Sequence, residues 1–278
     1  GHEVRCFGRR MGPGPVTIGR HGVEVRRIRT IDFLGRAGRA LSYAASLSWL
    51  LLRHRRWADI VYTRFLGEAA ATAAVWKSAG LLDAPLVATP ANTRGSGDTQ
   101  LLRSLPFGDA VLRFVDRHCD AINLIAADMV DELRAVGFRG ENFTRIPNGI
   151  ALRPLAPRDA AGPARWIAVG GLAGAKGYDL LLDALSRIRA RLSARQVRIV
   201  GDGPERERLQ AQAAALGIAD KIEWCGERTP DEVARLLDAS HLFLLPSRYE
   251  GLSNAAIEAM ERGLPMVLTR CGGIDHYV

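Results

Sequence analysis

Short β-rich runs alternate with longer helical patterns along this 278-residue chain, and the alternation runs through both halves. Such alternation argues for parallel β-sheets whose strands are joined by helical crossovers. The first half has candidate strands at 2–7, 23–28, 59–63, 86–89, 121–124 and 144–146, and candidate helices at 37–54, 67–79, 99–118 and 127–136. The second half has candidate strands at 166–169, 197–200, 221–225, 242–245 and 266–269, and candidate helices at 176–194, 204–216 and 254–262. Another helix is predicted after the capping-box run Thr229-Pro230-Asp231-Glu232.

A stretch without periodicity separates the two halves. Residues 151–163 are rich in Pro and Ala, which is typical of a linker. Each half is long enough to bury a core of its own. The sequence therefore predicts an α/β protein of two Rossmann-like, doubly wound domains, at residues 1–150 and 151–278, that face each other across a cleft.

Charge is distributed unevenly between the halves. The net charge is +8, and residues 1–150 hold 21 Lys and Arg against 14 Asp and Glu. A basic half can attract anionic lipid, nucleic acid or an anionic substrate. The apolar run 41–52 is too short to span a bilayer, and it leads into the basic run 53–57 (RHRRW). This segment is either a membrane-surface patch or a helix packed on the sheet with a cationic C-terminus that suits its dipole.

Two glutamates near the end of the chain have an informative setting. Glu250 lies in a Gly-containing loop after an apolar strand, and Glu258 lies a turn inside the helix that follows. A strand that leads into a loop and a helix N-terminus is where an open α/β sheet binds an anionic ligand. Because carboxylates repel phosphate, we expect their partners to be hydroxyls of a sugar or a ribose. The alternative is a solvent-facing helix stripe, since Asn254, Glu258 and Glu261 are spaced i, i+4 and i+7.

This segment also carries a family resemblance. Residues 247–267 (SRYEGLSNAAIEAMERGLPMV) resemble the E-x7-E region of retaining glycosyltransferases of the family 4 type, which have the two-domain GT-B fold. The resemblance implies that catalytic Glu250 and the backbone of Gly251, Leu252, Ser253 and Asn254 hold the hydroxyls of the transferred sugar. It implies that Glu258 binds the nucleotide ribose, so the expected donor is a nucleotide-diphosphate sugar.

A glycine-rich loop opens the second half. Residues 170–179 (GGLAGAKGYD) follow a strand, and glycines there let the backbone approach a diphosphate while a lysine supplies charge. The loop resembles the family's G-R-L-x-x-x-K-G element, which implies donor contacts from Gly170, Gly171 and Lys176, with Lys176 as the catalytic cation. Gly171 replaces the family's arginine, which removes one of two cations that stabilise the leaving diphosphate. The alternative for Lys176 is a solvated lysine at a helix start.

Other elements resemble the family less specifically. Residues 224–228 (WCGER) resemble the stretch that contacts the nucleotide base, and 146–150 (IPNGI) resemble the hinge between the domains. The resemblance implies base contacts from Trp224, Gly226, Glu227 and Arg228. In the loop 90–97 the family often has a histidine near the acceptor; here Arg94 is the candidate for an acceptor phosphate, or is simply solvated. No Asp-x-Asp and no His/carboxylate cluster with metal spacing occurs, so we expect neither a metal nor a cofactor.

Both ends of the chain depart from the family pattern. Residues 1–4 (GHEV) resemble the second strand of the family's first domain, and the chain stops at residue 278, before the family's last helices. The resemblance therefore implies that both domains are incomplete and that the chain is part of a longer enzyme. We expect weak stability and little turnover from the isolated polypeptide.

Taken together, these features predict that the protein is a retaining glycosyltransferase. It would act on a lipid-linked or polysaccharide acceptor, as in cell-surface glycan synthesis, with no nucleic-acid partner. The scattered cysteines fit a cytoplasmic protein, and the basic first domain predicts peripheral contact with the inner face of the membrane. Two alternatives stay open: a sugar-nucleotide epimerase of the same architecture, and a non-catalytic nucleotide-sugar binding module.

Overall fold

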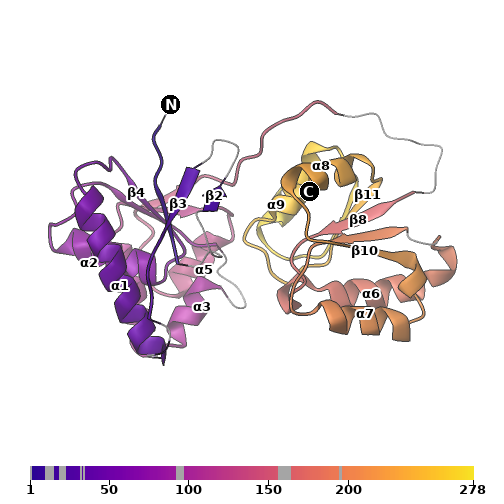
Figure 1. The fold of residues 1–278 in the computed structure, drawn as a ribbon, viewed down its shortest axis with the longest axis horizontal. Coiled ribbons are helices and arrows are strands. Elements are labelled where there is room, and N and C mark those ends of the chain that lie inside the picture. Colours follow the sequence, from indigo (N-terminus) through magenta and orange to yellow (C-terminus); the bar gives the residue numbers. More distant parts are fainter. Residues whose placement is uncertain are drawn as a thin grey trace. The chain divides into compact units, whose positions relative to one another are not determined.

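The computed structural model describes residues 2–9, 16–18, 23–31, 33, 35–91, 97–155, 164–193 and 196–278. The chain forms two compact units (Figure 1). The first unit comprises Gly1–Leu124 and Val130–Thr144, and the second comprises Ile125–Met129 and Arg145–Val278. The main change of unit therefore falls at Arg145, close to the boundary that the sequence predicts after residue 150.

The strands of the first unit form two sheets among the described residues. One sheet has the order β1-β3-β2, with β3 parallel to β1 and antiparallel to β2. The other has the order β4-β5-β6-β7, in which β4 and β5 as well as β5 and β6 run parallel. The bounds are β1 Cys6–Gly8, β2 Val16–Ile18, β3 Val23–Arg27, β4 Val61–Arg64, β5 Leu86–Thr89, β6 Ala121–Leu124 and β7 Phe143–Arg145. The sequence predicted every one of these strands except β2.

Helices of the first unit pack beside these strands, and α2 contacts both α1 and α4. Their bounds are α1 Gly35–His54, α2 Glu68–Ser78, α3 Asp98–Arg103, α4 Gly108–His118 and α5 Met129–Ala135. The prediction of one helix over 99–118 is wrong, because Pro106 lacks the N–H that a helix interior needs and Phe107 has φ of 62°. A Cβ at Gly108 would lie 1.9 Å from the Leu102 carbonyl oxygen, so α4 can begin there only with glycine.

The second unit contains a five-stranded sheet of parallel strands in the order β10-β9-β8-β11-β12. The bounds are β8 Trp166–Val169, β9 Val197–Val200, β10 Ile222–Gly226, β11 Leu242–Leu245 and β12 Met266–Leu268. The chain builds outward from β8 to β10 and then returns to add β11 and β12 on the other side. This order is that of a doubly wound Rossmann-like sheet, with its switch point between β8 and β11.

Helices cover both faces of this sheet, with α6 and α7 on one face and α8 and α9 on the other (Figure 1). Their bounds are α6 Tyr178–Arg187, α7 Arg206–Ala215, α8 Pro230–Asp238 and α9 Asn254–Glu261. The helix predicted over 176–194 is shorter in the structure, since α6 ends at Arg187 and a single 3-10 turn follows at Arg189–Arg191. The predicted capping box is confirmed: the Thr229 hydroxyl accepts from the Glu232 N–H, and the Glu232 carboxylate accepts from the Thr229 N–H.

The core of the second unit lies between the sheet and the α6–α7 layer. Buried side chains of α6 and α7 pack on those of the central strands, and include Leu182, Leu185, Ile199, Leu209 and Ala213. The sheet is thereby fixed as a rigid platform, and the loops at the carboxyl ends of its strands are anchored at both sides.

Candidate active site

The loops that follow β8 and β11 come into direct backbone contact. A Cβ at Gly177, where φ is 63°, would lie 2.0 Å from the Pro246 carbonyl oxygen, so only glycine fits there. In the segment after β12, a Cβ at Gly273 would lie 1.8 Å from the Gly251 carbonyl oxygen. The loops after β8, β11 and β12 therefore pack against one another at the switch point of the sheet, the place where open α/β sheets bind ligands.

This contact brings Lys176 and Glu250 together. The Lys176 Nζ donates to Glu250 Oε1 over 2.6 Å, and the Ser247 Oγ donates to the same oxygen over 2.8 Å. The Glu250 side chain is 9% exposed and the Lys176 side chain 34% exposed. An ammonium group has three donors and a carboxylate has two oxygens. Counting the contacts that described residues make, the pair therefore keeps two Nζ donors and the Glu250 Oε2 for further partners.

A second ion pair holds the lysine loop in place. The Arg248 guanidinium donates to both carboxylate oxygens of Asp179, over 2.8 and 2.7 Å, and to the Gly174 carbonyl oxygen over 2.8 Å. The backbone N–H of Arg248 also donates to the Ala175 carbonyl oxygen. The hydrogen bonds from Arg248 hold the pKa of Asp179 below its usual value. Such a bidentate pair fixes geometry, and here it ties the residues just before Lys176 to the loop after β11.

The helix α9 begins directly after this loop. Ser253 is its N-cap, and the Ser253 hydroxyl accepts from the Ala256 N–H over 3.4 Å. Leu252 is buried, so at this position the backbone rather than the side chain can contact a ligand. The Asn254 Oδ1 accepts from the Asn148 amide over 2.7 Å, which joins the segment 146–150 to the first residue of the helix. The remaining N–H groups of the first turn and the helix dipole favour a negative group here.

Glu258 is half-buried on the same helix. Burial raises the pKa of Glu258 above 4.5, nearby Arg153 opposes this rise and Glu261 adds to it. Within the described part of the chain, the Glu258 carboxylate makes no hydrogen bond. A carboxylate in this setting has acceptor positions for hydroxyl groups. The alternative that Glu258 belongs to a solvent-facing helix stripe does not explain its partial burial.

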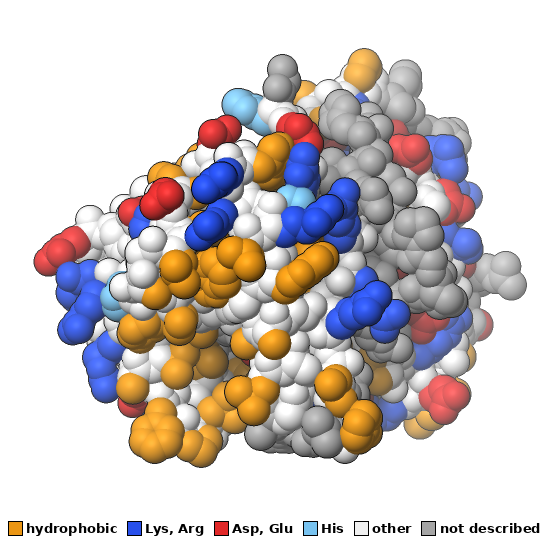
Figure 2. All heavy atoms as spheres, turned by 60° about the vertical axis from the view of Figure 1, so that its left-hand side comes forward, with side chains coloured by type: hydrophobic (Ala, Val, Ile, Leu, Met, Phe, Trp, Pro, Cys, Tyr) orange, Lys and Arg blue, Asp and Glu red, His pale blue; other side chains and the backbone are white. Residues whose placement is uncertain are grey.

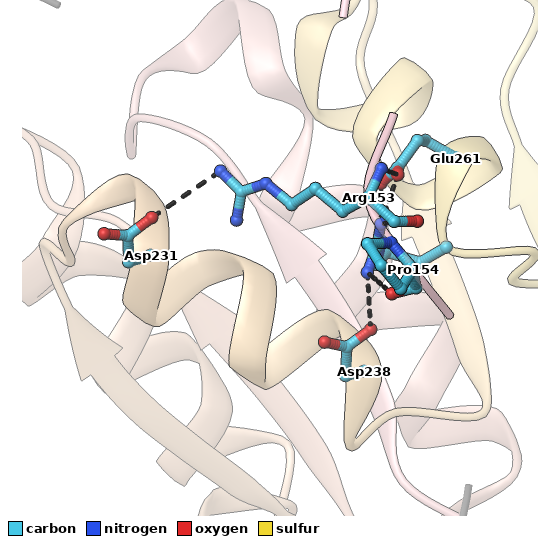
Figure 3. A network of polar contacts seen from close by, with 6 residues as sticks. Arg153, Pro154, Asp231, Asp238 and Glu261 are labelled. Carbon is cyan, nitrogen blue, oxygen red and sulfur yellow. Dashed lines mark hydrogen bonds and ion pairs between the residues drawn. The ribbon is translucent and has the colours of Figure 1, made fainter. Parts of the chain in front are cut away.

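A network of polar contacts places Arg153 beside this helix (Figure 3). Arg262, 3% exposed, donates to the carbonyl oxygens of Arg153 and Pro154 over 3.0 and 3.1 Å and pairs with Asp238 and Glu261. The backbone N–H of Arg153 donates to Glu261 over 2.6 Å. The start of the predicted linker is therefore fastened to the C-terminal ends of α8 and α9, and the Arg153 side chain extends toward Asp231, 3.6 Å away.

The other predicted site residues that the structure describes lie in the loop after β8, at the end of β10 and just beyond it. Gly170 and Gly171 begin the loop after β8, as predicted, and Gly226 ends β10 in a bulge. Trp224 packs against the core of the second unit, while the side chains of Glu227 and Arg228 are exposed. Arg94 lies outside the described residues.

Three residues of the site were not predicted from the sequence: Ser247, Arg248 and Asp179. Ser247 and Arg248 precede Glu250 in the same loop, which is a weak local signal. The pairing of Arg248 with Asp179 joins residues 69 positions apart and follows only from the neighbouring positions of β8 and β11.

Cys271 lies beside these loops and is buried. Burial and the neighbouring carboxylate of Glu250 raise the pKa of the Cys271 thiol to about 11, so it stays protonated near neutral pH. Over the described residues, no group of three or more His, Cys, Asp and Glu side chains is arranged to hold a metal ion. Likewise, none of the helices that the structure describes has the length and apolar content of a bilayer crossing.

Comparison with known proteins agrees with this architecture. Residues 1–149 match the family model described as "Glycosyl transferase 4-like domain", and residues 159–278 match "Glycosyl transferases group 1". The chain is 31% identical over 173 residues to glycogen synthase of Mycobacterium tuberculosis, which covers 61% of this chain and 42% of that protein. It is 34% identical over 116 residues to mannosylfructose-phosphate synthase of Agrobacterium fabrum, which covers 39% of this chain and 26% of that protein. The chain thus matches less than half the length of either relative.

A solved structure extends the likeness over most of the fold. Anabaena Alr3699/HepE, in complex with UDP and glucose, superposes with a TM-score of 0.73 at 19% identity. The match covers 93% of this chain and 71% of that one. The predicted fold class, α/β with two Rossmann-like domains of the GT-B type, is confirmed.

The Arg248–Asp179 pair gives the first testable prediction. In Arg248→Gln, amide hydrogen exchange in residues 171–179 is expected to speed up, because the loop loses its bidentate anchor. Global stability should fall by only about 1 kcal/mol or less, as for other part-exposed pairs. Hydrogen exchange read by mass spectrometry, with chemical denaturation alongside, checks both parts.

The matched control is Arg208→Gln, which breaks the exposed Arg208–Glu205 contact on α7. It should leave exchange in residues 171–179 unchanged. Equal exchange in both variants would mean that Arg248 does not hold the loop.

Proposed function

The chain belongs to the glycosyltransferase family of the 4-like and group 1 domains, and we propose that it transfers a glycosyl unit from a nucleotide-diphosphate sugar with retention of the anomeric configuration. The observation that carries the proposal is the Lys176–Glu250 pair, set at the switch point and beside the N-terminus of α9. Retention follows from the resemblance to the retaining family. The UDP seen in the Anabaena structure supports a nucleotide donor.

The transfer can be written in terms of these residues. The bond between the sugar anomeric carbon and a diphosphate oxygen breaks, and an acceptor hydroxyl oxygen forms the new bond while its proton leaves with the diphosphate. Negative charge grows on the leaving diphosphate, and Lys176 and the N–H groups at the start of α9 offset it. Glu250 accepts hydrogen bonds from the sugar hydroxyls through its open oxygen. Glu258 accepts from the ribose hydroxyls. The segment 224–228, at and just after the end of β10, lines the base.

Acceptor, cofactor and location complete the proposal. The acceptor is a glycan or a lipid-linked glycan, a choice supported by the polysaccharide-forming relative named above and by the basic first domain. Leaving-group stabilisation rests on Lys176 and backbone dipoles, so the reaction uses no metal and no cofactor. The protein works in the cytoplasm, at the inner face of a membrane.

A second candidate is a nucleotide-sugar binding module without turnover. Gly171 favours it, because the arginine that the family has at this position would supply a second cation for the diphosphate. A sugar-nucleotide epimerase of the same architecture is a third candidate, and no observation favours it specifically.

Product analysis separates these candidates. The full-length protein is incubated with each of the uridine, guanosine and adenosine diphosphate sugars and a glycan acceptor, and the products are identified by mass spectrometry and NMR. We expect free nucleoside diphosphate with an acceptor lengthened by one α-configured unit from an α-configured donor. An altered donor sugar would support the epimerase, and binding without turnover would support the module.

Glu258 makes the donor affinity dependent on pH. Its ionised carboxylate accepts charge-assisted hydrogen bonds from hydroxyl groups, which are stronger than those that the protonated acid accepts, and burial raises its pKa above 4.5. Nucleoside-diphosphate affinity should therefore fall as the pH is lowered toward that raised pKa. The Glu258→Gln variant should bind more weakly at pH 7 by about 1–3 kcal/mol, since a charge-assisted hydrogen bond is lost. Calorimetric titration across the pH range checks both statements.

Protonation of the diphosphate itself also weakens binding at low pH, so the comparison is between the two proteins. The difference in affinity between wild type and Glu258→Gln should shrink as the pH falls. A constant difference, or equal affinity at pH 7, would contradict the ribose role. The raised pKa of Glu258 also affects the free energy of unfolding, and there the pH dependence is opposite. It stabilises the folded protein below pH 4.5, and this stabilisation is lost as the pH rises through the folded-state pKa.

Gly171 offers a test by gain of affinity. A Cβ there would meet its nearest neighbour, the Asp202 carbonyl oxygen, at 3.7 Å, so a side chain fits without strain. Gly171→Arg restores the second cation, and nucleoside-diphosphate affinity should rise by about 1.5–3 kcal/mol. The matched control is Gly174→Arg in the same loop, where a Cβ has open space. If both variants raise affinity equally, general charge rather than the position of residue 171 is responsible.

A further inference from the structure

Helix α1 is apolar on two opposite sides. Tyr43, Leu47 and Leu50 face inward and pack on Ile28 in a core cluster of the first unit. On the opposite side, spaced i, i+4, i+8 and i+11, lie Leu41, Ala45, Trp49 and Leu52, which we name the α1 outer face. The side chains of this face are exposed, with Leu41 at 73%, Trp49 at 60% and Leu52 at 51%. A helix that is apolar all round is normally covered on every side.

Exposed apolar surface also lies on α2, the helix that packs against α1. Val75 of α2 is 54% exposed, and Figure 2, in which this side of the molecule comes forward, shows hydrophobic side chains gathered with Lys and Arg beside them. The helix is firmly seated, since the Trp76 Nε1 of α2 donates to the Ser48 Oγ of α1 over 2.9 Å. A contiguous exposed apolar patch on a rigid element marks an interaction surface.

Positive charge borders this face. Helix α1 contains no Asp or Glu, and Arg53 and His54 occupy its last turn. The exposed Arg53 guanidinium lies 5.8 Å from the centre of the Trp49 ring, and Arg56 is exposed just beyond the helix. The first acidic residue after the helix is Asp59. The surface therefore combines aliphatic side chains, an aromatic ring and cations, which is the composition of a helix that lies in a lipid interface.

We propose that the α1 outer face docks on the surface of an anionic lipid bilayer. Leu41, Trp49 and Leu52 insert between the headgroups, and Arg53 and Arg56 bind lipid phosphates. The inference deepens the proposed function, on which it rests for a lipid-linked acceptor, by naming the surface that brings the enzyme to that acceptor.

The size of the face favours lipid over a second copy of the chain. A 20-residue helix is about 30 Å long and about 10 Å wide, so its outer face offers on the order of 300 Å². A stable dimer buries about 800 Å² on each partner. Two copies would also bring Arg53 and Arg56 of each into the same interface, where like charges repel. An anionic bilayer, in contrast, pairs these arginines and accepts the apolar side chains.

Vesicle co-sedimentation of the full chain tests the proposal. Vesicles of phosphatidylglycerol with phosphatidylcholine are compared with vesicles of phosphatidylcholine alone. Wild type should bind the anionic vesicles much more tightly. Arg53→Gln/Arg56→Gln should weaken binding about fivefold for each arginine removed, and Leu41→Ser/Trp49→Ser/Leu52→Ser should weaken it by about tenfold or more.

The matched controls are Leu180→Ser, an exposed leucine of α6, and Arg228→Gln, an exposed arginine of the second unit. Both should bind vesicles like wild type. Because the readout is sedimentation rather than transfer, a loss of glycosyltransferase activity does not affect it, and failure of this inference leaves the proposed glycosyl transfer standing, although not the proposed location at a membrane. Circular dichroism verifies that each variant is folded.

Three results would overturn the proposal. One is wild type that binds neither vesicle, and another is face variants that bind as tightly as the controls. The third is a wild-type dimer that becomes monomeric in the Leu41→Ser/Trp49→Ser/Leu52→Ser variant without any vesicle binding, which would assign the face to a second copy of the chain.

Discussion

The close approach of the loops after β8 and β11 determines the geometry of the whole candidate site. The two strands are neighbours in the sheet, and the chain leaves them in opposite directions, so their loops meet at the switch point. The hydrogen of Gly177 is all that fits beside the Pro246 carbonyl oxygen. That contact sets the preceding residue, Lys176, at 2.6 Å from Glu250. A larger residue at 177 would separate the loops and with them the two charges.

Charges in this unit serve two distinct purposes. Arg248 and Asp179 satisfy each other bidentately, and buried Arg262 is satisfied by carbonyl and carboxylate oxygens, so these groups fix the backbone. Lys176 and Glu250 also pair, yet both keep hydrogen-bonding capacity, and Glu258 keeps more. The fully paired groups therefore position the groups that keep capacity, and the latter can bind phosphates and hydroxyls. In the first unit the outer face of α1 provides a separate surface, suited to a lipid interface rather than to chemistry.

Most of the fold could be predicted from local sequence patterns. Strands 166–169, 197–200 and 242–245 have the bounds that their apolar runs predicted, because buried parallel strands read as continuous apolar segments. Strand β2 was missed, since its short run Val16-Thr17-Ile18 stands among glycines and prolines that are typical of turns. The break between α3 and α4 was missed although Pro106 signalled it. At the site, the family motifs assigned Lys176 and Glu250 to one donor site but did not predict their ion pair, and both this pair and the Arg248–Asp179 pair depend on which strands are neighbours. For α1 the inward face packs in a core cluster, as the packed-helix alternative expected, but this packing does not decide the role of the outer face, which periodicity could not predict because both sides are apolar.

The most direct measurement is a crystal structure of the full chain with a nucleoside diphosphate bound. We expect the diphosphate between the Lys176 ammonium and the N-terminus of α9, with the ribose hydroxyls on the Glu258 carboxylate. A ligand bound elsewhere, with Lys176 still paired only to Glu250 and with Glu258 in contact with solvent alone, would contradict this expectation.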